Sequence, residues 1–305
     1  MNRGQGNDKI NDIMINEQLD LFQKDKVSVA IERLHKFEKI AKQEGLNIIC
    51  SFSGGKDSIV ILDLCKKSGI NFEAKFFQAF ESPEVLRFIK TEYSEVEFVS
   101  PHYSFYQAFR DKKIFPSRSI RWCCSLYKEG RTKNDASILG VRRAESIGRR
   151  DRKVMAIRLK KDRTGDKMKV FESHCYSERA NSRLELKPIV DWTDKDVWDY
   201  IKENNLHYPQ LYKEGFKRCG CMFCPLTNIE NNAYYIRKYP KQFLQIVKIA
   251  KEVYIPKKEY KIPYTTDYNI IVYCLYWLNY SWKAKTTKKE EQIIKDLADW
   301  LITLF

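Results

Sequence analysis

The stretch that decides the fold is residues 46–58, LNIICSFSGGKDS. Its first seven residues are mostly apolar and lie between Gly45 and the glycines at 54 and 55, which is typical of a short buried strand. From Asp57 the apolar residues follow helical spacing as far as Gly69. The pattern therefore predicts a strand, a glycine turn and a helix in direct succession.

The residues on either side repeat this alternation. Residues 27–45 have the apolar spacing of an amphipathic helix, residues 72–77 that of a strand and residues 83–93 that of a second helix. Alternating strands and helices form right-handed crossovers and a parallel sheet. We therefore expect an α/β fold of Rossmann-like type, a twisted parallel sheet with helices on both faces.

The rest of the chain is less regular. Residues 101–187 are basic and rich in candidate loops, with one strand signal at 154–159, and Thr193 with Asp196 predicts a capping box at the start of a helix. The sequence indicates an N-terminal extension over 1–26, an α/β domain with the cysteine pairs over 27–225, and a helical, aromatic C-terminal region over 226–305.

The glycine turn itself is Ser53, Gly54, Gly55, Lys56, Asp57 and Ser58. Two glycines let the backbone approach a ligand closely, and the dipole of the following helix favours an anion there. Lys56 adds a positive charge, the hydroxyls of Ser53 and Ser58 can donate to phosphate oxygens, and Asp57 can hold a metal or cap the helix. The spacing differs from the common GxxxxGK[ST] loop. A plain turn is the alternative to a phosphate site.

A second glycine precedes a group of arginines. Gly140 is followed by Arg142, Arg143 and Glu145. Paired arginines can grip phosphates with two hydrogen bonds each, and Glu145 can orient one of them. An arginine-rich helix start on an ordinary surface is the alternative.

The charge of the chain points to a polyanionic ligand. Lys and Arg number 55 against 40 Asp and Glu, which gives a net charge of +15. Residues 110–170 contain 20 basic and 7 acidic residues, a net charge of +13, so DNA or RNA is a candidate partner of this segment. The apolar run at 270–278 is too short to span a membrane. We expect a cytoplasmic protein with no membrane partner.

Five of the nine cysteines are grouped. Cys123 and Cys124 are adjacent, Cys221 and Cys224 form a CxxC pair, and Cys219 lies just before it. Two thiol pairs can hold tetrahedral zinc or a four-iron cluster, and adjacent thiolates suit the larger cluster better. Unligated thiols near a substrate are the alternative. Cysteines 50, 65 and 274 lie within apolar patterns and are expected in the core.

Taken in order, these groups resemble the phosphoadenosine phosphosulfate reductase family of the PP-loop, or adenine-nucleotide alpha-hydrolase, superfamily. The resemblance extends over roughly residues 27–225 and is carried by RWCC at 121–124, the stretch 140–146, PIVDWTDKDVWDY at 188–200 and YPQLYKEGFKRCGCMFCP at 208–225. It implies that the glycine turn is a PP-loop, which cradles the pyrophosphate of ATP. It also implies that Cys123, Cys124, Cys221 and Cys224 bind a [4Fe-4S] cluster, with zinc as the less favoured occupant.

Two departures separate the chain from sulfonucleotide reductases. No Glu-Cys-Gly segment follows Pro225, and Phe77-Gln78-Ala79 stands where the family usually shows Asp-Thr-Gly. The chain resembles instead the ATP-cleaving members found in DNA phosphorothioation systems or beside CRISPR loci. In these, Mg²⁺ bridges the phosphates of ATP and pyrophosphate leaves.

The resemblance therefore implies an ATP pyrophosphatase or adenylyltransferase with an iron-sulfur cluster, acting in sulfur transfer or nucleic-acid modification. Its implied partners include sulfur-donor or defence-system proteins. The catalytic residues would be Lys56, Asp57, Arg142 and Arg143, and the nucleotide-binding residues would be Ser53, Gly54, Gly55, Lys56, Asp57, Ser58, Gly140 and Glu145. The alternatives are a phosphoadenylyl-sulfate reductase and a non-catalytic nucleic-acid-binding accessory protein.

Overall fold

A computed structural model describes residues 25–117, 119–129, 135–158, 183–254, 266–279 and 286–305, and the chain divides into two compact units. Unit 1 comprises the described residues within Met1–Phe77, Arg87–Val99 and Gly130–Tyr212. Unit 2 comprises those within Gln78–Leu86, Ser100–Glu129 and Lys213–Phe305. The two units therefore interleave along the chain, whereas the sequence indicated one boundary, at residue 225, between the α/β domain and the C-terminal region.

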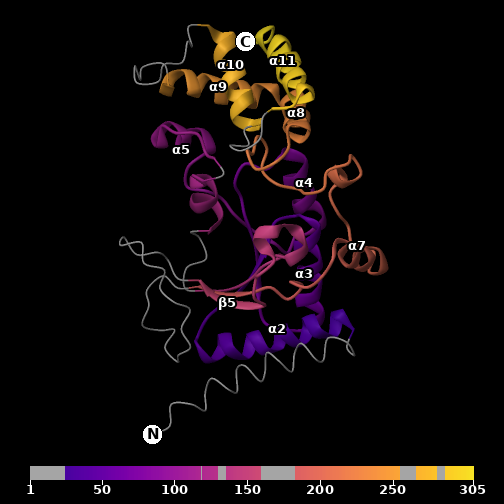
Figure 1. Ribbon diagram of the computed structural model, residues 1–305. Helices are drawn as coiled ribbons and strands as arrows, with labels where there is room; N and C mark the ends of the chain where they lie inside the picture. Colours follow the sequence, from indigo (N-terminus) through magenta and orange to yellow (C-terminus); the bar gives the residue numbers. More distant parts are fainter. Residues whose placement is uncertain (1–24, 118, 130–134, 159–182, 255–265, 280–285) are drawn as a thin grey trace. The chain divides into compact units, whose positions relative to one another are not determined.

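Unit 1 is the α/β part of the molecule (Figure 1). The sequence predicted the first helix, the first two strands and the helix between them to within about two residues of their ends. The elements are α2 (Lys26–Gln43), β1 (Ile48–Phe52), α3 (Lys56–Ser68), β2 (Glu73–Phe77), β3 (Glu97–Val99), β4 (Ala136–Ile138), the 3-10 turns η2 (Arg143–Glu145) and η3 (Ile147–Arg149), β5 (Met155–Arg158), β6 (Arg183–Leu186), α7 (Asp194–Glu203) and the 3-10 turn η4 (Gln210–Tyr212). Helix α4 (Pro83–Glu92) begins in the sequence of unit 2 and ends in that of unit 1.

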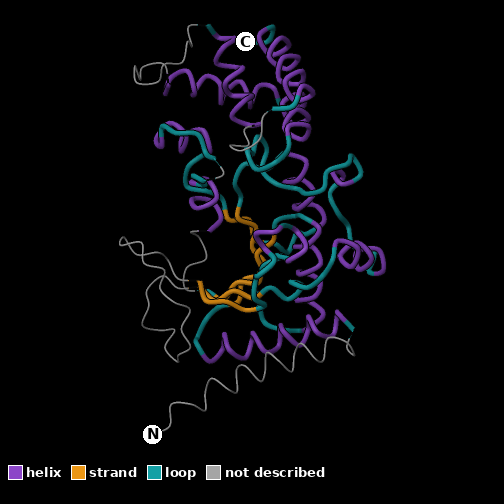
Figure 2. The backbone as a smooth tube through the Cα atoms, viewed as in Figure 1, coloured by secondary structure: helices purple, strands orange, loops and turns teal. Residues whose placement is uncertain are grey.

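Among the described residues, six strands form one sheet in the order β3-β2-β1-β4-β6-β5, drawn in orange in Figure 2. Neighbouring strands run parallel except for β5, which lies antiparallel to β6 at the edge. In the register of the sheet, Cys50 of β1 pairs with Ala74 of β2 and with Ile138 of β4. The α/β class with a mainly parallel sheet is thereby confirmed.

The strand order has a switch point between β1 and β4. The chain passes from β1 to β2 and β3 on one side, and then continues with β4 on the other side of β1. The segments that follow β1 and β4 leave the sheet at the carboxyl ends of two neighbouring parallel strands. Open α/β sheets bind their ligands at this position. The glycine turn follows β1, and Gly140 follows β4.

The core of unit 1 follows from the apolar faces of its helices. Asp25 caps the amino end of helix α2, since its carboxylate accepts a hydrogen bond from the backbone N–H of Ser28. The helix buries Leu34 and Phe37. Helix α3 is apolar on most sides and is buried along Ile59–Leu62, which suits a helix packed against strand β1 on one side and helices on others. Helix α7 begins with the capping box of Thr193 and Asp196 that the sequence predicted.

Unit 2 is helical and aromatic. Its elements are α5 (Phe105–Lys112), α6 (Trp122–Cys124), the π-helical turn η1 (Ser125–Glu129), α8 (Ile229–Lys238), α9 (Pro240–Tyr254), α10 (Asp267–Asn279) and α11 (Lys288–Ile302). Helices α8 to α11, coloured orange to yellow in Figure 1, pack against one another. The Trp277 ring of α10 stacks on Phe115 at 4.4 Å between centroids, and its indole N–H donates to the carbonyl of Pro116 at 2.6 Å. The C-terminal helices therefore share a core with the segment that precedes α6.

Three strands were missed in the sequence. Strands β3, β4 and β6 have three, three and four residues, and the last two lie in the stretch that was expected to be irregular. A run of three or four residues is too short to show a period of two. In the described part of the chain, no helix is both long enough and apolar enough to cross a membrane.

Candidate functional site

The glycine turn joins β1 to α3 and is closed by its own hydrogen bonds. Gly54 has a φ of +71°, a left-handed conformation that glycine adopts without a Cβ clash. The Ser58 hydroxyl donates to the carbonyl of Gly55 at 2.8 Å and accepts from the backbone N–H of Ser53 at 3.1 Å. The hydroxyls of Ser53 and Ser58 lie 3.1 Å apart. The two serines therefore hold the turn in shape at the amino end of α3.

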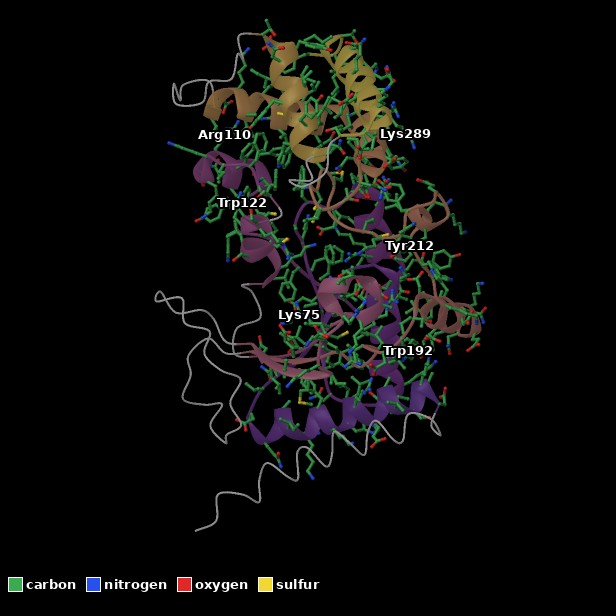
Figure 3. All side chains as sticks on the ribbon, in the orientation of Figure 1. Lys75, Arg110, Trp122, Trp192, Tyr212 and Lys289 are labelled. Atoms are coloured by element: carbon green, nitrogen blue, oxygen red, sulfur yellow. The ribbon has the colours of Figure 1, made fainter. Side chains whose placement is uncertain are left out.

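Lys56 is the first residue of α3, and its side chain is only 5% exposed. Its ammonium lies 3.2 Å from Oδ1 of Asp194, at the start of α7. The same ammonium lies 5.9 Å from the centroid of the Trp198 ring and 5.5 Å from that of Tyr212, within cation–π distance. The backbone N–H of Lys56 donates to the Tyr212 hydroxyl at 3.0 Å. Tyr212 and Trp192, labelled in Figure 3, lie on the segments that follow and precede α7.

Arg142 brings a second buried cation to the same place. Its side chain is 3% exposed, its Nε donates to Oδ1 of Asp57 at 2.5 Å, and its Nη2 donates to Oδ1 of Asp194 at 2.9 Å. Asp57 therefore pairs with Arg142 and does not cap the helix. The N-cap residue of α3 is Gly55, which has no side chain that could form a capping hydrogen bond. Lys56 and Arg142 share the carboxylate of Asp194.

The pKa values of the two carboxylates beside Arg142 are shifted in opposite directions. Burial raises the pKa of Asp57 above its ordinary value, and the charges of Arg142 and Lys56 offset only part of that effect. Burial also acts to raise the pKa of Asp194, but hydrogen bonds and charges from Lys56 and Arg142 outweigh it, so this pKa is lowered. Asp194 is therefore fully ionised at neutral pH.

The segment after β4 fits closely against the turn. A Cβ atom on Gly140 would lie 3.2 Å from the backbone carbon and Cβ of Asp57 and from the nitrogen of Ser58, closer than side-chain atoms normally pack. Glycine at 140 therefore lets this segment approach the first turn of α3. Glu145 accepts from the backbone N–H of Arg142 at 2.9 Å, which helps to fix the arginine.

Arg143 is engaged elsewhere in unit 1. Its guanidinium pairs with the carboxylate of Asp191, and its Nε donates to the carbonyl of Arg152 at 2.9 Å. Of the two adjacent arginines, Arg142 is the one that the structure places beside Lys56 and Asp57.

Unit 2 holds the four paired cysteines. Cys123 and Cys124 lie on α6, and Cys221 and Cys224 lie in the turn before α8. The backbone N–H of Met222 donates to the carbonyl of Phe80 at 2.8 Å, and residues 81 and 221 form an antiparallel bridge, so the CxxC turn is anchored to the segment after β2. Trp122, labelled in Figure 3, stacks on Phe105 and fixes the other pair.

A lysine and a glutamate face the thiols. The Lys128 ammonium lies 2.8 Å from Oε1 of Glu81 and 3.4 Å from Sγ of Cys221. Burial raises the pKa of Cys221 to about 12, against the lowering effect of Lys128. A hydrogen bond from Cys123 lowers the pKa of Cys124 to about 5 despite burial, with further lowering by Arg121 and Lys128.

The chemistry of this thiol centre can be compared with two kinds of metal group. The pKa of Cys123 is raised first by its hydrogen bond with Cys124, then by burial, and then by the charges of Cys124, Cys221 and Cys224, so the four thiols share one electrostatic environment. In the described part of the chain, no group of three or more His, Cys, Asp or Glu side chains is placed so that it could hold a metal ion. Thiolates are the donors of both structural zinc sites and iron–sulfur clusters, so the chemistry of the four side chains fits either group.

Comparison with known proteins gives the family. Residues 47–227 match the phosphoadenosine phosphosulfate reductase domain, which is more than half of the chain. The chain belongs to this family. The matched residues include the glycine turn at 53–58, called the PP-loop below, and both cysteine pairs.

Individual relatives are distant. An uncharacterised protein of Methanocaldococcus jannaschii is 28% identical over 80% of this chain and 57% of its own length, and a second from the same organism is 27% identical over 71% and 43%. The chain thus spans about half the length of these two relatives. An adenosine 5′-phosphosulfate reductase of Oceanobacillus iheyensis is 27% identical over 59% of this chain and 72% of that protein.

Two solved structures are similar at low identity. The phosphoadenylyl-sulfate reductase of Candida auris, in a phosphate complex, has a TM-score of 0.42 and 17% identity over 66% of this chain and 90% of its own. The FMN adenylyltransferase of Candida glabrata has a TM-score of 0.42 and 14% identity over 64% and 62%.

Sequence reasoning singled out the glycine turn and Arg142 as candidates but not the residues that lie against Lys56. Asp194, Trp198 and Tyr212 all contact Lys56. Asp194 carries the signal of an ordinary acidic residue in a first helical turn, and Tyr212 carries none, because only the tertiary fold brings η4 to the start of α3. Cysteines 50, 65 and 274 are buried, as their apolar surroundings predicted. Cys175, the ninth cysteine and with Cys219 a candidate nucleophile if the protein is a reductase, lies outside the described residues.

Proposed function

We propose that the PP-loop of this protein binds the pyrophosphate portion of Mg²⁺-bound ATP and that the protein cleaves ATP between the α- and β-phosphates. The observation that carries the proposal is the meeting of two buried cations, Lys56 and Arg142, at the amino end of α3 and at the β1/β4 switch point. Buried cations and helix amides stabilise phosphate anions strongly because water does not screen them.

Each residue has a role in this proposal. The amides of the PP-loop and the Lys56 ammonium would neutralise the leaving pyrophosphate, and Arg142 would add a planar pair of donors. Asp57 holds Arg142 in place by a charged hydrogen bond. Arg143 pairs with Asp191 and would support the fold of this region rather than contact the phosphates.

Pyrophosphate release from Mg·ATP tests the proposal. We expect Lys56→Ala to lose at least about 100-fold in rate, because one charge-stabilising donor supplies about 3 kcal/mol to a transition state. Lys66→Ala is the matched control, since Lys66 lies on the same helix and pairs with Glu95 at the surface. Equal pyrophosphate release by wild type and Lys56→Ala would contradict the proposal, and so would no release by wild type with any acceptor class supplied.

We also propose that Cys123, Cys124, Cys221 and Cys224 hold a [4Fe-4S] cluster in unit 2. The four thiols and the neighbouring Lys128 and Arg121 support this donor set. Such a cluster supplies one-electron chemistry or a site for sulfur, and it can also serve the fold alone. Anaerobic purification followed by iron, sulfide and zinc analysis tests it. A colourless protein without iron would contradict it.

We propose a nucleic acid as the class of acceptor for the AMP group of ATP. The protein would then act in sulfur transfer or nucleic-acid modification. The support is the +13 charge of residues 110–170, of which 118, 130–134 and 159–170 lie outside the described residues. Binding of duplex and single-stranded DNA and RNA at several salt concentrations tests this step, with a steep fall of affinity at higher salt expected. Affinity that does not depend on salt would count against it.

Reduction of a sulfonucleotide is the second candidate, favoured by the relatives named adenosine 5′-phosphosulfate reductase. That reaction requires an accessible thiolate. Cys274 is fully buried in α10, and burial raises its pKa, whereas Cys219 is partly exposed. Release of sulfite from adenosine 5′-phosphosulfate in the presence of a dithiol, abolished by Cys219→Ser, would favour this second candidate over ATP cleavage.

A further inference from the structure

The exposed carboxylate of Asp194 occupies the cations of the PP-loop. Its Oδ1 lies 3.2 Å from the Lys56 ammonium and 2.9 Å from Nη2 of Arg142. The side chain of Asp194 is 63% exposed, whereas those of Lys56 and Arg142 are 5% and 3% exposed. A single solvent-facing anion is therefore bound by two buried cations. An exposed carboxylate regains full hydration when it turns away, so phosphate oxygens can displace it.

A second internal contact occupies the helix end. The first backbone N–H of α3, on Lys56, donates to the Tyr212 hydroxyl at 3.0 Å. An N–H at this position is one that an anion normally accepts from. The Tyr212 ring packs edge-on against Trp198 of α7 at 5.1 Å, so the hydroxyl and the Asp194 carboxylate both come from residues 194–212.

These contacts engage the same hydrogen-bond donors that a bound phosphate would use. An anionic oxygen bridges an ammonium and a guanidinium, and a neutral oxygen accepts from a helix amide. An incoming phosphate must replace both oxygens before it can reach Lys56 and Arg142. When a ligand must replace an internal one, its apparent affinity equals its intrinsic affinity multiplied by the fraction of molecules in which the internal ligand is not bound.

We propose that Asp194 and Tyr212 are an internal ligand of the PP-loop, which phosphate oxygens displace on binding and which returns to Lys56 and Arg142 when pyrophosphate leaves. Asp194 is then the residue that sets the affinity for the anionic product. This inference rests on the proposed function of the PP-loop as a nucleotide-phosphate site.

The effect of removing the carboxylate grows with the charge of the ligand. In Asp194→Asn the two cations keep a side chain of the same shape without its charge, so a polyanion gains most and an uncharged ligand gains nothing. We expect about tenfold tighter binding of pyrophosphate, a smaller gain for orthophosphate, and no change for adenosine. Tyr212→Phe, which keeps the ring on Trp198, should tighten pyrophosphate binding about threefold.

Titration calorimetry of the full chain with pyrophosphate, orthophosphate and adenosine tests the inference. Asp199→Asn is the matched control, since Asp199 lies on the same helix, carries the same charge and pairs with exposed Lys195. Pyrophosphate should also inhibit ATP cleavage at about tenfold lower concentration in Asp194→Asn. The melting temperature of each variant checks that its fold is intact. A damaged fold would weaken binding, whereas the inference predicts tighter binding.

Three outcomes separate the inference from the proposed function. Weaker pyrophosphate binding by Asp194→Asn would show that the carboxylate serves the bound state, and it would overturn the inference alone. A change no larger than that of Asp199→Asn would also overturn it. If neither the wild type nor any variant binds pyrophosphate or ATP, the inference and the proposed function both fail.

Discussion

The PP-loop of unit 1 and the thiol centre of unit 2 are built in different ways. The PP-loop is one contiguous turn, closed by hydrogen bonds between Ser53 and Ser58. The thiol centre is assembled from three segments that are distant in sequence, which carry Glu81, Cys123 with Cys124, and Cys221 with Cys224. A local turn depends on its own residues, whereas an assembled centre depends on the core that brings its segments together. The thiol centre should therefore be the more sensitive of the two to remote substitutions.

The largest expected effect follows from the proposed cluster and is the loss of iron in Cys221→Ser. A serine oxygen is a poor ligand for a cluster that binds through thiolates, so we expect the variant to retain less than about a tenth of the iron. The same variant should bind an ATP analogue with an affinity within about twofold of wild type. Iron analysis and calorimetry on one preparation measure both.

Cys219→Ser is the matched control, because Cys219 lies two residues away and is outside the proposed ligand set. It should keep its iron. Loss of nucleotide binding together with iron in Cys221→Ser would show that the two regions are coupled, contrary to the comparison.

The second effect is on the stability of unit 2. Asn232 of α8 is fully buried, and its amide donates to the carbonyls of Cys224 at 3.2 Å and Leu278 at 3.4 Å. Asn232→Ala leaves both carbonyls without this donor, at an expected cost of about 2–3 kcal/mol in the free energy of unfolding. Denaturant unfolding measures the cost, and iron content should fall as well.

Asn231→Ala provides the comparison for Asn232, because the neighbouring side chain is only partly buried and its amide donates locally, to the Thr227 hydroxyl at 3.4 Å. We expect a change below about 0.5 kcal/mol for this surface substitution. Equal costs for the two variants would show that the CxxC turn does not depend on the amide of Asn232.

A smaller effect is expected where the PP-loop meets the segment after β4. Gly140→Ala places a methyl group 3.2 Å from the backbone of Asp57 and Ser58, so β4 and α3 must move apart by a few tenths of an ångström. We expect a cost of about 1–2 kcal/mol and weaker pyrophosphate binding. Gly148→Ala, where an added Cβ meets nothing within 4 Å, is the control. An unchanged affinity in Gly140→Ala would place the ligand away from this contact.

The same difference explains what the sequence could predict. The PP-loop could be identified because all its features lie within six residues, and the parallel sheet because α2, β1, α3 and β2 have clear apolar periods. Strand β4, which completes the switch point, has three residues and no readable period. Its position could be learned only from the sheet itself.

The partners of the candidate residues were the least predictable feature. The sequence indicated two neighbouring arginines but not that Asp57 and Asp194 would select Arg142, and Asp191 would select Arg143. Such pairings depend on the relative positions of η2, α3 and the start of α7, which are set by packing rather than by local spacing.

The smallest expected effect is the pH dependence that Glu84 gives to the stability of unit 2. Glu84 accepts hydrogen bonds from the Tyr239 hydroxyl and from the Lys238 ammonium, the latter at 3.0 Å. Burial acts to raise the pKa of Glu84, but these hydrogen bonds and one from its own backbone N–H outweigh it, so the pKa lies below its ordinary value of 4.5. A lowered pKa in the folded state stabilises the protein above pH 4.5, and this contribution is lost as the pH falls through the lowered pKa.

Glu84→Gln should therefore cost less than about 1 kcal/mol at pH 7, since Lys238 is partly exposed and water screens the pair. The difference from wild type should shrink towards zero as the pH is lowered below 4.5. Thermal unfolding, measured between about pH 3.5 and pH 7 in steps of about half a pH unit, follows this change. Glu230→Gln is the control, because Glu230 pairs with Lys289 (Figure 3) at 3.5 Å on the surface. If the cost of Glu84→Gln is the same at every pH, the glutamate acts through its shape rather than its charge.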